Sequence, residues 1–154
     1  MTLNDLLDLA LRHEIKSQQM YLDWFSIVQD ADARDFLLEL VRQEKQHETA
    51  LLQMINAHVF TGTEELENWE LYKEIEESHS IVVEIGKDAH IGEVLELALQ
   101  RERHAQALFH RLALSTQDSE LRSIFESLER QEGDHSVQIM AMFDRSLRRM
   151  RTGS

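Results

Sequence analysis

Two copies of one short pattern in this chain are suited to binding metal. Glu44 lies three residues before His47, and Glu132 lies three residues before His135. On an α-helix, residues three apart occupy neighbouring turns of one face, so each pair can direct a carboxylate and an imidazole at the same ion. Because transition metals bind both kinds of ligand, the two pairs predict a metal site.

The two motifs belong to a longer internal repeat. A shift of 88 positions brings Glu44 onto Glu132 and His47 onto His135, and it brings Asp30 onto Asp118 without a gap. Self-similarity at one fixed offset indicates duplication of a structural unit. We therefore interpret the chain as two copies of a helical hairpin, each of which carries one motif.

The same offset relates two further carboxylates, Glu14 and Glu102, which lie in otherwise apolar helix stripes. A lone inward carboxylate must lose its hydration or become neutral, so four such groups facing two imidazoles favour bound cations. The set suits two transition-metal ions with bridging carboxylates and open positions for oxygen species. The predicted metal ligands are Glu14, Glu44, His47, Glu102, Glu132 and His135.

Other residues near these positions have weaker signals. A third Glu-x-x-His pattern, Glu76 with His79, has no counterpart at the repeat offset, so we interpret it as coincidence. Tyr21 stands seven residues after Glu14 and falls on the ligand face, where its hydroxyl could hydrogen-bond a ligand carboxylate or supply an electron, or simply belong to the core. Gln18 and Gln106 lie one turn after Glu14 and Glu102, and we expect their amides to donate hydrogen bonds to the ligand carboxylates. The remaining histidines are interpreted as ordinary exposed or half-buried residues: His13, His58, His90, His104 and His110.

The elements that must position these residues are helices. The chain has no proline and only five glycines, and helix-forming residues dominate, so the predicted fold class is all-α. Apolar spacing predicts hairpin one over about 3–58 and hairpin two over about 89–149. The intervening segment, about 59–88, is predicted to be a crossover with a short acidic helix and an extended stretch. Two hairpins joined by one long crossover make a four-helix bundle of ferritin-like connectivity, and we expect residues 1–154 to form one domain.

Composition excludes several other functions. The absence of cysteine removes disulfides, thiolate catalysis and cysteine-ligated metal sites. A net charge of −13 argues against binding to nucleic acid, which requires Lys and Arg to neutralise phosphates. No window approaches the about 18 apolar residues of a membrane span, and no leader precedes the first helix, so we expect a cytoplasmic protein with no membrane association.

With these motifs in place, the chain resembles the rubrerythrin family of ferritin-like di-iron domains over nearly all of residues 3–147. The resemblance implies a non-haem centre of two iron ions, with zinc or manganese as possible substitutes. It also implies reduction of hydrogen peroxide, or reaction with dioxygen, with electrons from an external donor. We further expect a homodimer or higher oligomer. Tyr21 is the candidate catalytic residue.

Two departures from the family pattern keep other functions open. The family carries an additional glutamate one turn before the third-helix ligand, where this chain has Leu99, and a cysteine-free chain cannot carry the rubredoxin module that many members have. The six remaining ligands resemble a bacterioferritin-like ferroxidase centre. The alternatives are thus a ferroxidase or iron-handling protein, and a non-enzymatic metal-binding helical interaction protein.

Overall fold

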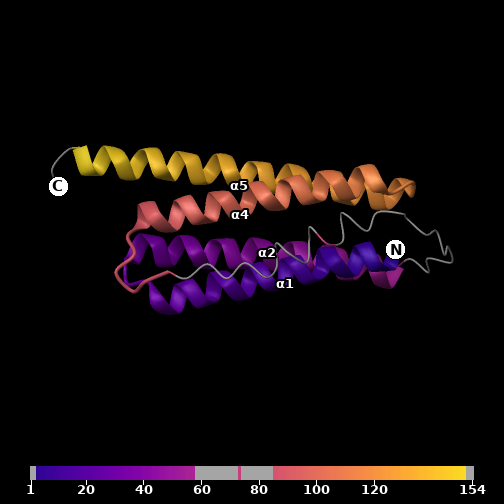
Figure 1. Cartoon of the computed structure of the whole chain (residues 1–154), viewed down its shortest axis with the longest axis horizontal. Helices are drawn as coiled ribbons and strands as arrows, with labels where there is room; N and C mark the ends of the chain where they lie inside the picture. The colour runs from indigo at the N-terminus through magenta and orange to yellow at the C-terminus, as the bar shows by residue number, and fades with distance from the viewer. Residues whose placement is uncertain (1–2, 58–72, 74–84, 152–154) are drawn as a thin grey trace.

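The computed structural model describes residues 3–57, 73 and 85–151, and this part of the chain contains helices and no strand. Four long helices make up most of this described part (Figure 1): α1 (Leu3–Ile27), α2 (Ala31–Ala57), α4 (Ile91–Ser115) and α5 (Ser119–Arg151). The predicted all-α class is confirmed, and the helices end within a few residues of the expected positions. The predicted crossover helix and extended stretch and the Glu76–His79 pattern lie outside the described residues, apart from Lys73, Ile85 and Gly86.

The helices are arranged as two antiparallel hairpins packed side by side. α1 packs along α2, α4 packs along α5, and α2 contacts α4 between the hairpins. Figure 1 shows that α2 and α4 start at the same end of the bundle, so the end of α2 and the start of α4 lie at opposite ends. This order is that of the predicted ferritin-like bundle, in which one connection must return along the whole length of the molecule.

The repeated turns begin the second helix of each hairpin in the same way. The backbone N–H of Ala33 donates to Asp30 Oδ1 at 2.9 Å, and the N–H of Leu121 donates to Asp118 Oδ1 at 2.9 Å. Such aspartate caps satisfy N–H groups that have no partner within the helix. At α4 the cap is His90, whose Nδ1 accepts from the N–H of Glu93 at 3.4 Å.

Two hydrophobic clusters fill the bundle on either side of a polar layer. One cluster includes Leu7, Phe109 and Phe125, and the other includes Tyr21 and Leu95. Along every helix, the predicted metal ligands fall between the residues of the two clusters. The apolar clusters therefore hold the polar layer in the middle of the molecule, away from water.

No helix in the described part of the chain is both long and apolar enough to cross a membrane.

Candidate metal centre

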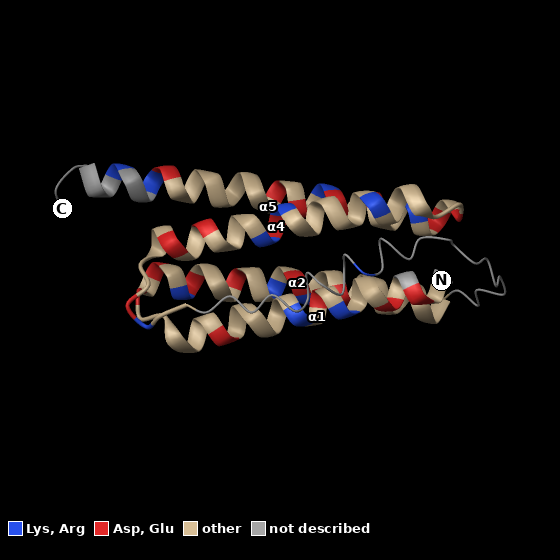
Figure 2. Ribbon diagram, viewed as in Figure 1, with Lys and Arg blue, Asp and Glu red and all other residues tan. Residues whose placement is uncertain are grey.

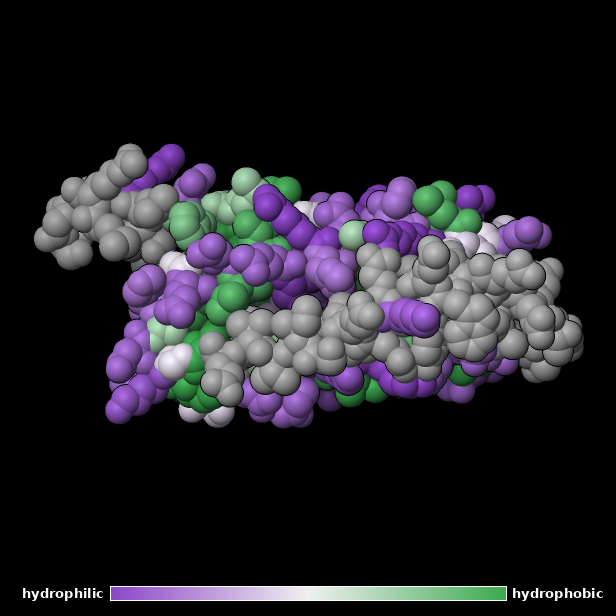
Figure 3. Space-filling view, viewed as in Figure 1, coloured by the Kyte–Doolittle hydropathy of each residue, from purple (hydrophilic) through white to green (hydrophobic). Residues whose placement is uncertain are grey.

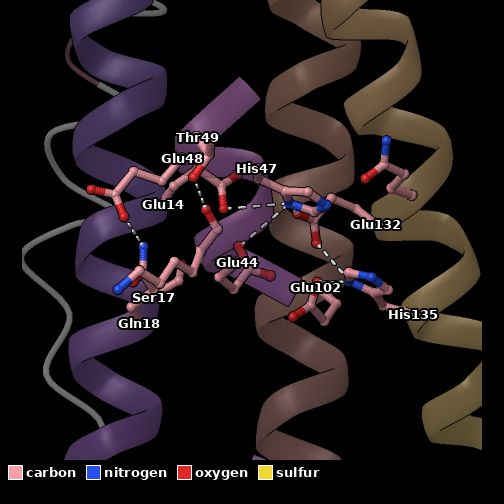
Figure 4. Close-up of polar contacts among 12 residues, drawn as sticks. Glu14, Ser17, Gln18, Glu44, His47, Glu48, Thr49, Glu102, Glu132 and His135 are labelled. Carbon is pink, nitrogen blue, oxygen red and sulfur yellow. Dashed lines mark hydrogen bonds and ion pairs between the residues drawn. The ribbon is translucent and has the colours of Figure 1, made fainter. Parts of the chain in front are cut away.

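All six predicted metal ligands lie in the polar layer, and all six are buried. Each of the four long helices supplies part of the set, because each hairpin contributes one glutamate from its first helix and one Glu-x-x-His pair from its second. Figure 4 shows the side chains pointing toward one another at the centre of the bundle. They are Glu14 from α1, Glu44 and His47 from α2, Glu102 from α4, and Glu132 and His135 from α5.

The six side chains form two overlapping groups of four. In each group, one ligand atom from every residue lies within 4.8 Å of the others. The first group is Glu14, Glu44, His47 and Glu132; the second is Glu44, Glu102, Glu132 and His135. Glu44 and Glu132 belong to both groups, whereas each of the other four ligands belongs to one. This arrangement suits two neighbouring cations with two shared carboxylates.

The imidazoles face the carboxylates through their Nδ1 atoms. His47 Nδ1 lies 3.0 Å from Glu132 Oε1 and 3.5 Å from Glu14 Oε2. His135 Nδ1 lies 3.4 Å from Glu102 Oε2. The two rings are stacked, with their centroids 5.4 Å apart and an angle of 6° between their planes. Parallel rings with both Nδ1 atoms facing the carboxylates place one nitrogen ligand in each group.

Burial and crowding shift the protonation of the cluster. Burial, together with the neighbouring Glu44 carboxylate, raises the pKa of Glu14 well above its ordinary value, and burial with the Glu102 carboxylate does the same for Glu132. For Glu102, burial opposes ionisation, but interactions with Glu132 and His135 lower its pKa to about 2. Glu14 and Glu132 therefore ionise at little cost only when positive charge is added nearby.

The histidines supply part of that charge. Burial opposes the charged imidazole, but the surrounding carboxylates outweigh it and raise the pKa of His135 to about 9. The pKa of His47 is raised further for the same reason, chiefly by Glu132 and Glu14. In the metal-free protein, both imidazoles are thus doubly protonated and positively charged near neutral pH.

Unsatisfied polar atoms show that the cluster fits metal ions. Several buried atoms of the ligands make no hydrogen bond, although they lie close together. They are both carboxylate oxygens of Glu14 and Glu132, Oε2 of Glu44 and Glu102, and Nδ1 of His47 and His135. Buried polar groups without partners are costly, and oxygen and nitrogen donors in this number are the ligands of transition metals such as iron.

Metal binding should release protons and strengthen with pH. Because a metal binds the neutral imidazole, His47 and His135 must each lose a proton near neutral pH when the site fills. Calorimetric titration of the metal-free protein with cobalt(II), in buffers of different ionisation enthalpy, measures this release. We expect the affinity to rise between about pH 6 and pH 8. An affinity that does not change over this range would contradict the protonation assigned to the cluster.

Three predicted accessory residues have different outcomes. Tyr21 is fully buried on the ligand face, and its hydroxyl donates to Glu102 Oε1 at 2.8 Å. Gln18, by contrast, does not donate to a ligand: its Nε2 donates to Glu48 Oε2 at 2.7 Å. Gln106 lies against Gly133, where a Cβ atom would be 2.9 Å from its Nε2. The small residue thus leaves room for the amide of Gln106 beside the shared ligand Glu132.

The structure also corrects one interpretation and adds one contact. His13, expected to be exposed or half-buried, is fully buried and packs edge-on against Phe109 with ring centroids 6.1 Å apart. Arg101, the residue before Glu102, donates to the buried Ser17 Oγ at 2.9 and 3.2 Å. This bridge joins α1 to α4 beside the site. The sequence hinted at it only by placing Ser17 one turn after Glu14.

Comparisons with known proteins were consistent with this geometry. The sequence model of the family described as Rubrerythrin matches residues 5–143 of the chain. Among solved structures, the chain is similar to a candidate ferritin-like diiron-carboxylate protein from Thermotoga maritima. The two share 21% sequence identity with a TM-score of 0.65, over 95% of this chain and 97% of the other, which establishes a common fold. No curated protein matches this chain in sequence.

Proposed function

Because this chain belongs to the rubrerythrin family, we propose that it is a di-iron oxidoreductase that reduces hydrogen peroxide with electrons from an external donor. The observation that carries the proposal is the pair of four-residue groups sharing Glu44 and Glu132. Both hairpins are needed to build this site, and the family match spans both, which supports one functional domain.

The chain's own residues would prepare the site for this chemistry. Bound iron would supply the redox chemistry by which hydrogen peroxide, two electrons and two protons become two molecules of water. The six ligands fix the position of the ions, and the apolar clusters on either side keep bulk water out. Tyr21 holds a proton on its hydroxyl against Glu102 Oε1. Burial, with the carboxylates of Glu102 and Glu44, raises the pKa of Tyr21 well above its ordinary value, so this proton is firmly held.

Tyr21→Phe tests the role of that hydroxyl. We expect the variant to keep both metal ions, because Tyr21 belongs to neither ligand group. Loss of the hydrogen bond to a buried carboxylate should lower the free energy of unfolding of the metal-free protein by about 1–3 kcal/mol. Because the hydroxyl orients the Glu102 carboxylate through this hydrogen bond, its loss should slow reoxidation by peroxide by about 10- to 100-fold. A rate equal to that of the wild type, measured by stopped-flow absorbance at full metal content, would remove Tyr21 from the reaction.

A ferroxidase is the second candidate, and one observation favours it. Leu99, at the position where the family carries an additional glutamate, packs half-buried against the hydrophobic cluster that contains Leu95. The site therefore has six candidate ligands rather than seven, which is the set that resembles a bacterioferritin-like ferroxidase centre. Zinc or manganese could occupy the site in place of iron.

The oxidant separates the two candidates. The reduced, iron-loaded protein would be mixed without oxygen with hydrogen peroxide, and separately with dioxygen. Rapid stoichiometric reoxidation by peroxide, with a slow reaction with dioxygen, is the result expected of the proposed peroxidase. The reverse order, with oxidised iron released from the site, would support the ferroxidase and overturn our proposal.

A further inference from the structure

The outward face of α5 carries an apolar centre between two charged flanks. Val137 and Met140 lie next to each other there with 66% and 48% of their surfaces exposed. The surrounding segment 136–143 has no charged residue, which Figure 2 shows as an uninterrupted tan stretch of α5. Figure 3 shows hydrophobic atoms over the same part of the helix. The ligands Glu132 and His135 are directed into the bundle from the other side of α5, so this face is separate from the metal centre.

The charges on this face are arranged symmetrically about Val137. Arg130 and Asp144 lie seven residues before and after it, and Glu126 and Arg148 lie eleven residues before and after it. At about 100° per residue, all four fall within about 20° of the direction of Val137. All four are exposed. Within the described part of the chain, Glu126 Oε1 makes a weak, exposed ion pair, 3.7 Å from Arg122 Nε, which another partner could replace. Arg130 and Glu126 thus each have an opposite charge at the same distance after Val137, whereas the exposed Asp134, three residues before Val137, has Met140 at that distance after it.

This pattern is self-complementary in one orientation only. When two copies of α5 pack antiparallel with Val137 at their centre, residues equidistant from Val137 meet, so Arg130 faces Asp144 and Glu126 faces Arg148. A parallel pairing would instead place each charge against its own copy. The antiparallel pair has a two-fold axis, which is the commonest symmetry of protein dimers and brings the same surface of both subunits together.

We propose that this protein forms a homodimer through the outward face of α5, which is defined by Glu126, Arg130, Val137, Met140, Asp144 and Arg148. The two-fold axis passes between the two copies of Val137. The apolar centre supplies the buried contact, and the charge pairs around it fix the orientation and suppress other pairings. The proposal does not depend on the metal or on the reaction.

Cysteine cross-linking tests the orientation directly, because the natural chain has no cysteine. When two packed helices have axes about 8–10 Å apart, the Cα atoms that face each other across the two-fold axis lie within reach of a disulfide. Val137→Cys, oxidised with oxidised glutathione, should therefore link rapidly into a dimer. The control is Leu114→Cys on α4, since Leu114 is as exposed at 64% but lies outside the face. A mixture of Arg130→Cys and Asp144→Cys should link between the two variants. Faster linking of Arg130→Cys to itself, or equal linking by Val137→Cys and Leu114→Cys, would overturn the proposal.

Charge and mass measurements test the interface without a cross-link. Val137→Lys should weaken the dimer at least about 30-fold in sedimentation equilibrium, whereas Leu114→Lys should leave it intact. Arg148→Glu should weaken it, and Arg148→Glu combined with Glu126→Arg should restore it. All variants should keep their helical circular dichroism and the metal content of the wild type, which separates this interface from the metal centre. A wild-type protein that is monomeric at high micromolar concentration, or a Val137→Lys variant with unchanged mass, would overturn the proposal.

Discussion

Glu132→Gln is expected to abolish binding of both metal ions, whereas Glu14→Gln is expected to leave one. Glu132 belongs to both ligand groups, and its two oxygens approach His47 and His135 separately, at 3.0 and 3.7 Å. The amide keeps the size of the side chain but removes its charge, so each ion would lose a shared ligand. Glu14 belongs to the first group alone. We expect a loss of affinity of at least about 100-fold for every ion that loses a ligand.

Metal analysis of purified, iron-loaded variants measures this difference. Glu48→Gln is the matched control, because Glu48 lies one turn after Glu44 on α2 and is half-buried, yet it belongs to neither group. It should keep both ions. A Glu132→Gln variant that retains one tightly bound ion would show that this carboxylate is not shared. Loss of metal from Glu48→Gln would show that the metal centre depends on residues outside the two groups.

Metal loading is expected to stabilise the fold strongly. In the metal-free protein, burial raises the pKa values of Glu14 and Glu132, so stability contributed by their protonated forms is present at acidic pH and is lost as pH rises. Bound cations would offset the negative charge that Glu14 and Glu132 acquire when they ionise. Each site should add about 2.7 kcal/mol to the free energy of unfolding when free metal exceeds the dissociation constant 100-fold. For a chain of this size, two sites should raise the melting temperature by about 10 °C or more.

Thermal unfolding near neutral pH, with and without a chelator, measures this gain. Glu132→Gln provides the comparison, because it should show little metal-dependent change in melting temperature. Its metal-free form should be at least as stable as the metal-free wild type, since a neutral amide replaces a group that is costly to ionise. Equal melting temperatures for the loaded and metal-free wild type would contradict a metal-binding role for the cluster.

The sequence was most informative where the repeat constrained it. Glu14 and Glu102 could be selected from many surface glutamates because one offset related both to the Glu-x-x-His motifs, and the structure buries both beside them. The turns were predictable for the same reason, because Asp30 and Asp118 are repeat counterparts and cap equivalent helices.

Features that depend on contacts between helices were not predictable. The periodicity of α1 places Gln18 near the ligand face but does not show that Glu48 of α2 is closer to its amide than any ligand is. The bridge from Arg101 to Ser17 joins residues 84 positions apart, which do not match in the repeat. His13 is buried because Phe109 of α4 packs against its ring, a partner that its own helix does not reveal. Helix spacing and the repeat thus predicted the six residues that the structure brings together, but not the partners around them.

The central claim, that these six residues form one site for two metal ions, is tested most directly by the metal content of protein loaded with iron without oxygen. We expect two ions per chain in the wild type and none in Glu44→Ala combined with Glu132→Ala, because both shared carboxylates are then missing. A wild type that never binds two ions per chain, together with an unchanged metal content in the double variant, would contradict the claim.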